Sequence, residues 1–197
     1  MNGDDAEALR AALRSDEPQH LRIFFDRHYD AMATLLRPDA GSEDDVDEII
    51  RSVWQEAIAS GDTIRNHESP RGFVFSFLLQ HLGEVEETDE PDTVDDDDPF
   101  VPDGMPWAGH WEELPQPWGP ETETWLRSDD GRRAVTAFLD SAPLVDRVLL
   151  VLRDMDGWSA SDVTALTGLG ADDQQAVLTG ARDALHLAID RSVRELA

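Results

Sequence analysis

The sequence has 197 residues, a hydrophobic fraction of 40% and a formal net charge of −27, which suits one domain or two small ones around an apolar core. It contains no Cys, and this excludes disulfides, thiolate metal sites and Cys nucleophiles. No apolar run approaches the roughly 18 residues of a membrane span, and the N-terminus lacks the basic-then-apolar order of a signal peptide, so we expect a cytoplasmic protein with no membrane partner.

Three helices are predicted in the first domain, residues 1–83. Apolar residues recur at three- and four-residue steps over 21–36. A second helix begins after Ser42 and has an apolar face that ends at Ile58. A third begins at Ser69, a cap followed by Pro, and is apolar nearly all round. The pattern predicts a three-helix bundle with the third helix at its centre.

The next segment, residues 84–130, holds 17 acidic residues against one Arg, Arg127. It also contains seven Pro, which remove backbone donors and forbid a continuous helix. We predict an acidic linker, rich in Pro and Trp, that is extended and disordered at least through Asp98. An acid bias shared by the whole proteome is an alternative explanation for the charge.

The last domain, residues 131–197, shows a helix-turn-helix pattern. Helical stretches are predicted over residues 134–139, 144–153, 160–167 and from 172 onward. Ser159 and Asp162 form a capping pair at the start of the third stretch. A Gly-Leu-Gly turn separates the third stretch from the fourth, which is the plan of a helix-turn-helix.

This all-α order of elements resembles the extracytoplasmic-function sigma factors, the promoter-recognition subunits of bacterial RNA polymerase. Residues 138–185 are similar to region four of that family, with a Pro-x-x-x-Arg helix, an Asp-x-x-Gly turn and a recognition helix that ends in Gly-Ala-Arg. Residues 109–118 resemble the Trp- and Pro-rich linker of one subset. Residues 43–54 and 69–82 resemble the region-two helices that grip the polymerase clamp and help to melt DNA.

The resemblance implies a transcription regulator whose partners are core RNA polymerase, promoter DNA and an anti-sigma factor or other basic regulatory protein. It assigns polymerase binding to the polar face of the second helix, at Asp47, Glu48, Arg51 and Gln55. It assigns DNA reading to the recognition helix, at Gln174, Gln175, Thr179 and Arg182.

The charge of the last domain opposes DNA reading. Asp172 and Asp173 open the recognition helix, where they face phosphates, and residues 144–197 hold nine acidic residues against five Arg. Three hypotheses therefore stay open: a working sigma factor from an acidic proteome, a paralogue that acts through protein contacts without reading promoters, and an acidic DNA mimic that captures a basic partner through the segment Glu84–Asp130, which includes the run Asp95–Asp98.

Neither a metal site nor an enzymatic site is predicted. The six His residues form no i, i+4 pair, and no nucleophile constellation or phosphate-binding Gly-rich loop stands out. We expect a non-enzymatic protein without a cofactor.

Overall fold

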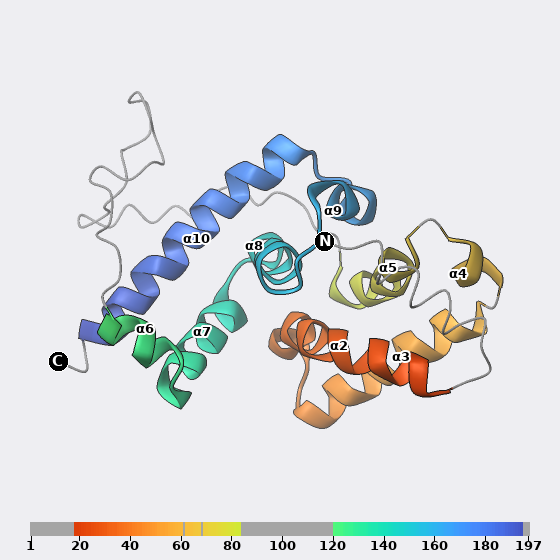
Figure 1. Ribbon diagram of the computed structural model, residues 1–197, viewed down its shortest axis with the longest axis horizontal. Coiled ribbons are helices and arrows are strands. Elements are labelled where there is room, and N and C mark those ends of the chain that lie inside the picture. Colours follow the sequence, from red (N-terminus) through yellow and green to blue (C-terminus); the bar gives the residue numbers. More distant parts are fainter. Residues whose placement is uncertain (1–17, 61, 68, 84–119, 195–197) are drawn as a thin grey trace.

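The computed structural model describes residues 18–60, 62–67, 69–83 and 120–194, and the regular elements in these ranges are all helices (Figure 1). The all-α prediction is confirmed for them. In chain order the elements are α2 (Pro18–Leu36), η1 (Arg37–Asp39), α3 (Glu43–Ala59), α4 (Asp62–Asn66), α5 (Pro70–Leu82), α6 (Pro120–Leu126), α7 (Asp129–Ser141), α8 (Leu144–Leu149), η2 (Leu150–Met155), α9 (Ala160–Thr167) and α10 (Ala171–Arg194).

Side-chain caps begin α3 and α5 where the sequence predicts them. Ser42 Oγ accepts a hydrogen bond from the backbone N–H of Asp45 at 3.2 Å. Ser69 Oγ accepts one from the backbone N–H of Gly72, also at 3.2 Å. Each cap satisfies a backbone donor that has no partner within its helix. The short helix α4 between them was not predicted.

The last part of the predicted linker contains a helix. Helix α6 begins at Pro120, inside the range assigned to the linker, because Pro at the first helical position needs no backbone donor. The turn from α6 into α7 is tight: a Cβ on Gly131 would lie 2.3 Å from the carbonyl oxygen of Trp125. Only Gly fits at this position. Residues 84–119, which include the run Asp95–Asp98, lie outside the described residues.

Two helices, α9 and α10, flank the Gly-Leu-Gly turn. Ser159 and Asp162 make a full capping box at the start of α9, in which each side chain accepts from the other residue's backbone N–H. The helix ends at Gly168, whose φ of 83° lies in the left-handed region that Gly adopts without strain. Helix α10 then starts at Ala171, one residue before its predicted start.

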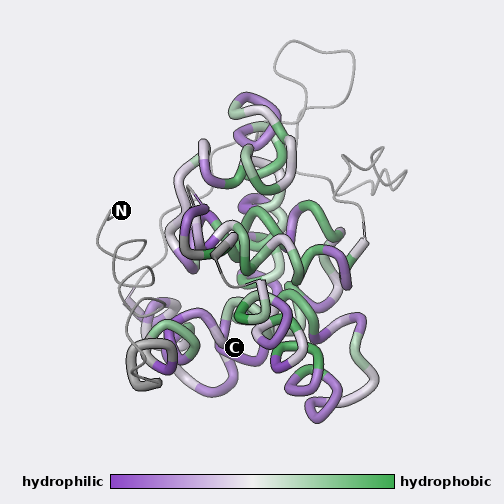
Figure 2. Tube along the Cα trace, turned by 90° about the vertical axis from the view of Figure 1, so that its right-hand side faces the viewer, coloured by the Kyte–Doolittle hydropathy of each residue, from purple (hydrophilic) through white to green (hydrophobic). Residues whose placement is uncertain are grey.

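The described helices on both sides of residues 84–119 contribute to one hydrophobic core. Fully buried side chains from α2–α5 and from α8–α10 belong to the same cluster, among them Met32, Leu35, Phe75, Leu78, Leu149, Leu152 and Leu178. Hydrophobic positions gather where the helices meet, and hydrophilic ones occupy the outer turns (Figure 2). Helices α8 and η2 lie in the middle, between α2 on one side and α10 on the other (Figure 1).

Candidate functional site

The expected polymerase contacts share one exposed face of α3. Asp47, Glu48, Arg51 and Gln55 are all exposed, and their spacing of three and four residues sets them along one side of the helix. The opposite side is buried in the core, where Ile50 is fully covered. The exposed face is acidic at its start, because the first turn of α3 has three acidic residues.

A hollow of about 440 Å³ lies beside this face, between α2 and α3. It is lined by Phe25, Tyr29, Asp47, Arg51, Trp54, Gln55 and Ile58. The hollow therefore combines an aromatic floor with a charged rim, and three of the four expected contact residues belong to the rim. We call this surface, the hollow with Glu48, the α3 face.

Ile58 corrects a sequence expectation. Its place on the apolar side of α3 predicted burial, but its side chain is 48% exposed because it stands at the edge of the hollow. Two aromatic neighbours form the floor below it: the ring centroids of Phe25 and Trp54 are 5.7 Å apart. An exposed large apolar side chain above an aromatic floor is suited to contact with an apolar side chain of a partner.

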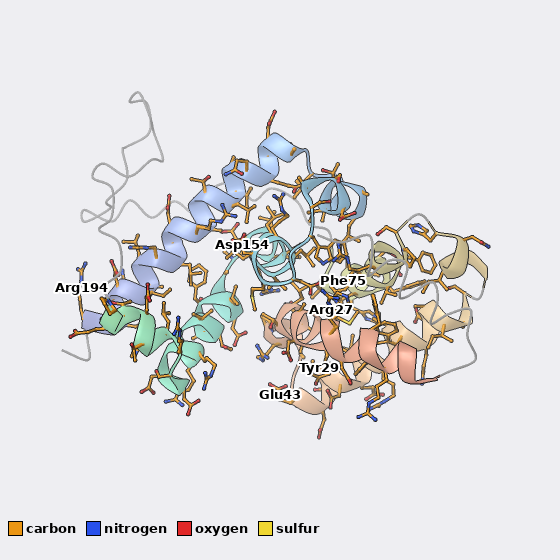
Figure 3. All side chains as sticks on the ribbon, in the orientation of Figure 1. Arg27, Tyr29, Glu43, Phe75, Asp154 and Arg194 are labelled. Carbon is orange, nitrogen blue, oxygen red and sulfur yellow. The ribbon has the colours of Figure 1, made fainter. Side chains whose placement is uncertain are left out.

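Tyr29 and Asp47 join α2 to α3 at the rim of the hollow. The Tyr29 hydroxyl donates a short hydrogen bond to the Asp47 carboxylate. This bond raises the pKa of Tyr29, and burial and the negative charge of Asp47 raise it further. Tyr29 and Glu43 lie on the same side of the molecule, away from Asp154, which lies beside α10 (Figure 3). Sequence reasoning missed Tyr29 as a site residue.

Gln174 was expected to read a base, and this expectation is wrong. Its side chain is fully buried, with an exposed fraction of 0%. Its amide nitrogen donates to Thr164 Oγ1 and to the backbone oxygen of Leu169, both at 2.9 Å, and its oxygen accepts from Arg153 at 2.8 Å. Gln174 joins the start of α10 to α9 and to the turn between them, and its buried amide is not presented to a base.

The other three expected DNA contacts reach the surface but already have partners. Gln175 is exposed, and its amide nitrogen lies 3.4 Å from Thr179 Oγ1, which itself donates to the Gln175 backbone oxygen at 2.9 Å. Arg182 donates two hydrogen bonds to Asp154, which raise the pKa of the guanidinium. The Arg that the resemblance assigns to DNA therefore binds a carboxylate of the same chain.

The outer surface of α10 has acidic side chains at its start and a Gly, which has no side chain, near its middle. Asp172 and Asp173 are both exposed in the first turn. At Gly180 a Cβ would meet nothing within 4 Å, so this part of the helix is open to solvent. Two carboxylates at a helix N-terminus repel the phosphates that such an end otherwise attracts.

The ranges described include no group of three His, Asp or Glu side chains that could hold a metal ion. Among the same residues, no helix has the length and apolar content needed to cross a membrane. We found no match to a protein-family model, to a curated protein or to a solved structure.

Proposed function

We propose that this chain is a sigma-factor-like transcription regulator that binds bacterial core RNA polymerase in the cytoplasm, through the α3 face. The single observation that carries the proposal is the hollow beside α3, where an aromatic floor and the exposed Ile58 lie next to Asp47, Arg51 and Gln55. The resemblance assigns polymerase binding to this same side of this same helix.

The chemistry of the face indicates what the partner surface offers. Interface cores are enriched in aromatic side chains and Arg, and their rims are polar. The α3 face has this arrangement, with Trp54 in the floor and Arg51 at the rim. The exposed acidic residues Glu43, Asp44 and Asp45 lie at its N-terminal end, and with Glu48 they favour a basic partner surface.

We further propose that the chain acts through protein contacts and does not read promoters. Three observations support this version over a working sigma factor. Gln174 is buried, Arg182 is paired with Asp154, and the exposed start of α10 is acidic. The acidic DNA mimic stays the third hypothesis, and the run Asp95–Asp98 lies outside the described residues.

The test is binding to core polymerase from a high-GC bacterium, measured by co-elution and by titration of fluorescently labelled protein. Arg51→Glu reverses a charge at the rim of the hollow, and we expect it to weaken binding at least about tenfold, a loss typical of an interface hot spot. Arg133→Glu is the matched control, since Arg133 is exposed on α7 and pairs with Asp130 of the same helix. We expect the control to bind like the wild type.

The outcomes separate the hypotheses. Equal binding of the Arg51→Glu and wild-type proteins would exclude the α3 face, and failure of the wild type to bind would overturn the whole proposal. Run-off transcription on fragmented genomic DNA then tests promoter reading. Transcript starts that share an upstream motif would show a working sigma factor and contradict the version proposed here.

A further inference from the structure

The hollow beside α3 has the size and the lining of a small-molecule pocket. Its volume is about 440 Å³, and ligand pockets in proteins range over about 300–1,000 Å³. Such pockets combine aromatic and apolar walls with a few polar groups that fix the orientation of the ligand. Here three aromatic rings meet three polar side chains: Phe25, Tyr29 and Trp54 with Asp47, Arg51 and Gln55. The hollow can therefore hold a small ligand as well as a side chain of a protein partner.

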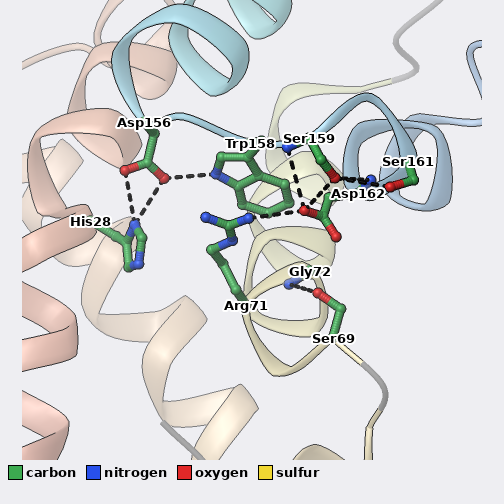
Figure 4. A network of polar contacts seen from close by, with 9 residues as sticks. All are labelled: His28, Ser69, Arg71, Gly72, Asp156, Trp158, Ser159, Ser161 and Asp162. Atoms are coloured by element: carbon green, nitrogen blue, oxygen red, sulfur yellow. Dashed lines mark hydrogen bonds and ion pairs between the residues drawn. The ribbon is translucent and has the colours of Figure 1, made fainter. Parts of the chain in front are cut away.

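The floor of the hollow is fixed from its buried side. Trp54 is only 6% exposed, and its ring meets Phe24 edge to face at 5.5 Å between centroids. His28, which precedes Tyr29 in α2, is buried, and its Nδ1 lies 2.8 Å from Asp156 Oδ2 (Figure 4). These contacts hold α2 and α3 to the core, so the hollow exists before a ligand arrives and binding needs little rearrangement.

Arg51 stands at the rim of the hollow without a carboxylate partner. Asp47 lies four residues before it, which is the spacing at which opposite charges pair along a helix. The Asp47 Oδ1 atom instead accepts the short hydrogen bond from the Tyr29 hydroxyl. Among the residues that the structure describes, no hydrogen bond or ion pair involves the exposed Arg51 side chain. The hollow thus presents a negative and a positive group side by side.

The charges around the hollow favour a ligand that carries both signs and is neutral overall. The first turn of α3 has three acidic residues and the chain has a net charge of −27, so an anion is repelled. A simple cation is attracted to this surface but leaves the Arg51 guanidinium without a counter-ion. A zwitterion satisfies both groups, because its ammonium can donate to Asp47 Oδ2 while its carboxylate accepts from Arg51.

We propose that the hollow is a binding site for a free α-amino acid with an aromatic side chain. The ammonium and carboxylate groups of such a ligand share one carbon, and Asp47 and Arg51 lie about 6 Å apart along the axis of α3. The ligand ring packs on Phe25 and Trp54, since aromatic rings attract one another in tilted or offset contacts. Ile58, at the edge of the hollow, covers the outer side of the ligand ring.

A bound amino acid also regulates the α3 face, a consequence that rests on the proposed polymerase binding. The ligand and the polymerase both use Asp47 and Arg51, so they compete. Competition multiplies the apparent Kd of the polymerase by one plus the ratio of the ligand concentration to its own Kd. We expect a rise of about elevenfold when the ligand is present at ten times its Kd.

Isothermal titration calorimetry of the full chain with L-phenylalanine tests the site without polymerase. Three analogues each lack one of the recognised groups: phenylpropionate has no ammonium, phenethylamine has no carboxylate and glycine has no ring. Each analogue loses either a charge-assisted hydrogen bond or the burial of an aromatic side chain. We therefore expect each of them to bind at least about tenfold more weakly than L-phenylalanine.

Variants at exposed positions locate the ligand in the hollow. Asp47→Asn and Arg51→Gln are each expected to weaken L-phenylalanine binding at least about tenfold. Tyr29→Phe keeps the ring but releases Asp47 to pair with Arg51, so it should weaken binding about twofold, the strength of such a pair. Asp172→Asn and Arg133→Gln are the matched controls, since they make the same changes at exposed positions of α10 and α7. Both controls should bind like the wild type.

The results separate the ligand, its position and its regulatory effect. No binding of L-phenylalanine, or equal binding of L-phenylalanine and phenylpropionate, would overturn the ligand assignment. Equal affinity of the wild-type and Arg51→Gln proteins would show that the ligand does not bind in the hollow. Unchanged polymerase affinity at saturating L-phenylalanine would overturn the regulatory effect. A wild-type protein that binds L-phenylalanine but not polymerase would overturn the proposed function and support the amino-acid site.

Discussion

Arg182 donates two hydrogen bonds to Asp154, at 2.9 Å and 2.7 Å, and this pair ties α10 to η2. Asp154 lies in the π-helical turn, in which the backbone N–H of Asp156 bonds to the carbonyl of Val151 five residues back. The Arg assigned to DNA by resemblance thus has a structural partner.

The Arg182–Asp154 pair should contribute little to stability. Its side chains are 46% and 35% exposed, so water screens their attraction. We expect Arg182→Ala to lower the free energy of unfolding by about 0.2–1 kcal/mol. Urea denaturation of Arg182→Ala, Asp154→Ala and the double variant measures this, and the double variant should lose no more than the sum of the two. A much larger loss would show that Arg182 makes other important contacts.

Gln174 should matter much more than its neighbour Gln175. Gln174→Leu removes a buried amide and leaves the partners Arg153 and Thr164 without it, which is expected to cost about 1–3 kcal/mol of unfolding free energy. Gln175→Leu changes an exposed side chain and is expected to change the free energy of unfolding by no more than about 0.5 kcal/mol. Urea denaturation of both variants decides the order. The reverse order would contradict the structural role of Gln174.

Local sequence signals predicted the starts of α3, α5 and α9, because each of these starts depends on nearby residues. Ser42, Ser69 and Ser159 all cap the helices that they were expected to begin. Helix α6 was not predicted inside the linker, although it begins at Pro120, because Pro interrupts the interior of a helix but fits at its first position. Proline content alone cannot decide between these two roles.

The sequence predicted only those residues of the candidate site that lie on one helix, α3. The exposed residues of α3 were found by their spacing, but Tyr29 belongs to α2 and reaches Asp47 through tertiary packing. Gln174 was assigned to DNA because it stands at the start of a reading helix, where periodicity cannot tell a buried amide from an exposed one. The contact between His28 and Asp156 spans 128 positions of sequence, and no local pattern indicates it.

The hydrogen bond between Tyr29 and Asp47 should be visible in a titration. Tyr29 is the only Tyr in the sequence, so the ultraviolet absorbance of its phenolate can be followed without overlap from another Tyr. We expect a midpoint above the ordinary value of 10.0, because the bond and the neighbouring charge of Asp47 disfavour the phenolate. Asp47→Asn should lower the midpoint toward that value. An unchanged midpoint would contradict the contact.

The raised pKa of Tyr29 determines whether the stability of the protein rises or falls at alkaline pH. The folded protein holds the Tyr29 proton more tightly than the unfolded chain does, so this stabilisation is fully present below the unfolded pKa near 10.0 and is lost as the pH rises through the folded value. The Tyr29→Phe variant has no phenol to ionise, so its stability should not show this loss at alkaline pH. Denaturation of both proteins across alkaline pH measures the difference.

Asp146 offers the last test, at acidic pH. It stands in the first turn of α8, and burial raises the pKa of its carboxyl group because the charged form loses hydration. The folded state therefore prefers the protonated acid, and ionisation of Asp146 destabilises the protein at neutral pH. Asp146→Asn, which keeps the shape without the charge, should be more stable than the wild type there. The gain should shrink as the pH falls through the raised pKa, where the wild-type carboxyl also becomes neutral.

Asp44→Asn is the matched control for this comparison, since Asp44 lies in the first turn of α3 and is exposed. The Asp44→Asn variant loses the same favourable interaction between a carboxylate and a helix N-terminus, but it does not remove a buried charge. It should therefore be slightly less stable than the wild type at neutral pH. Urea denaturation of the three proteins at several pH values from acidic to neutral separates the two effects. If Asp146→Asn is the less stable protein at neutral pH, the helix dipole outweighs the cost of burying the charge, and the carboxylate of Asp146 stabilises α8.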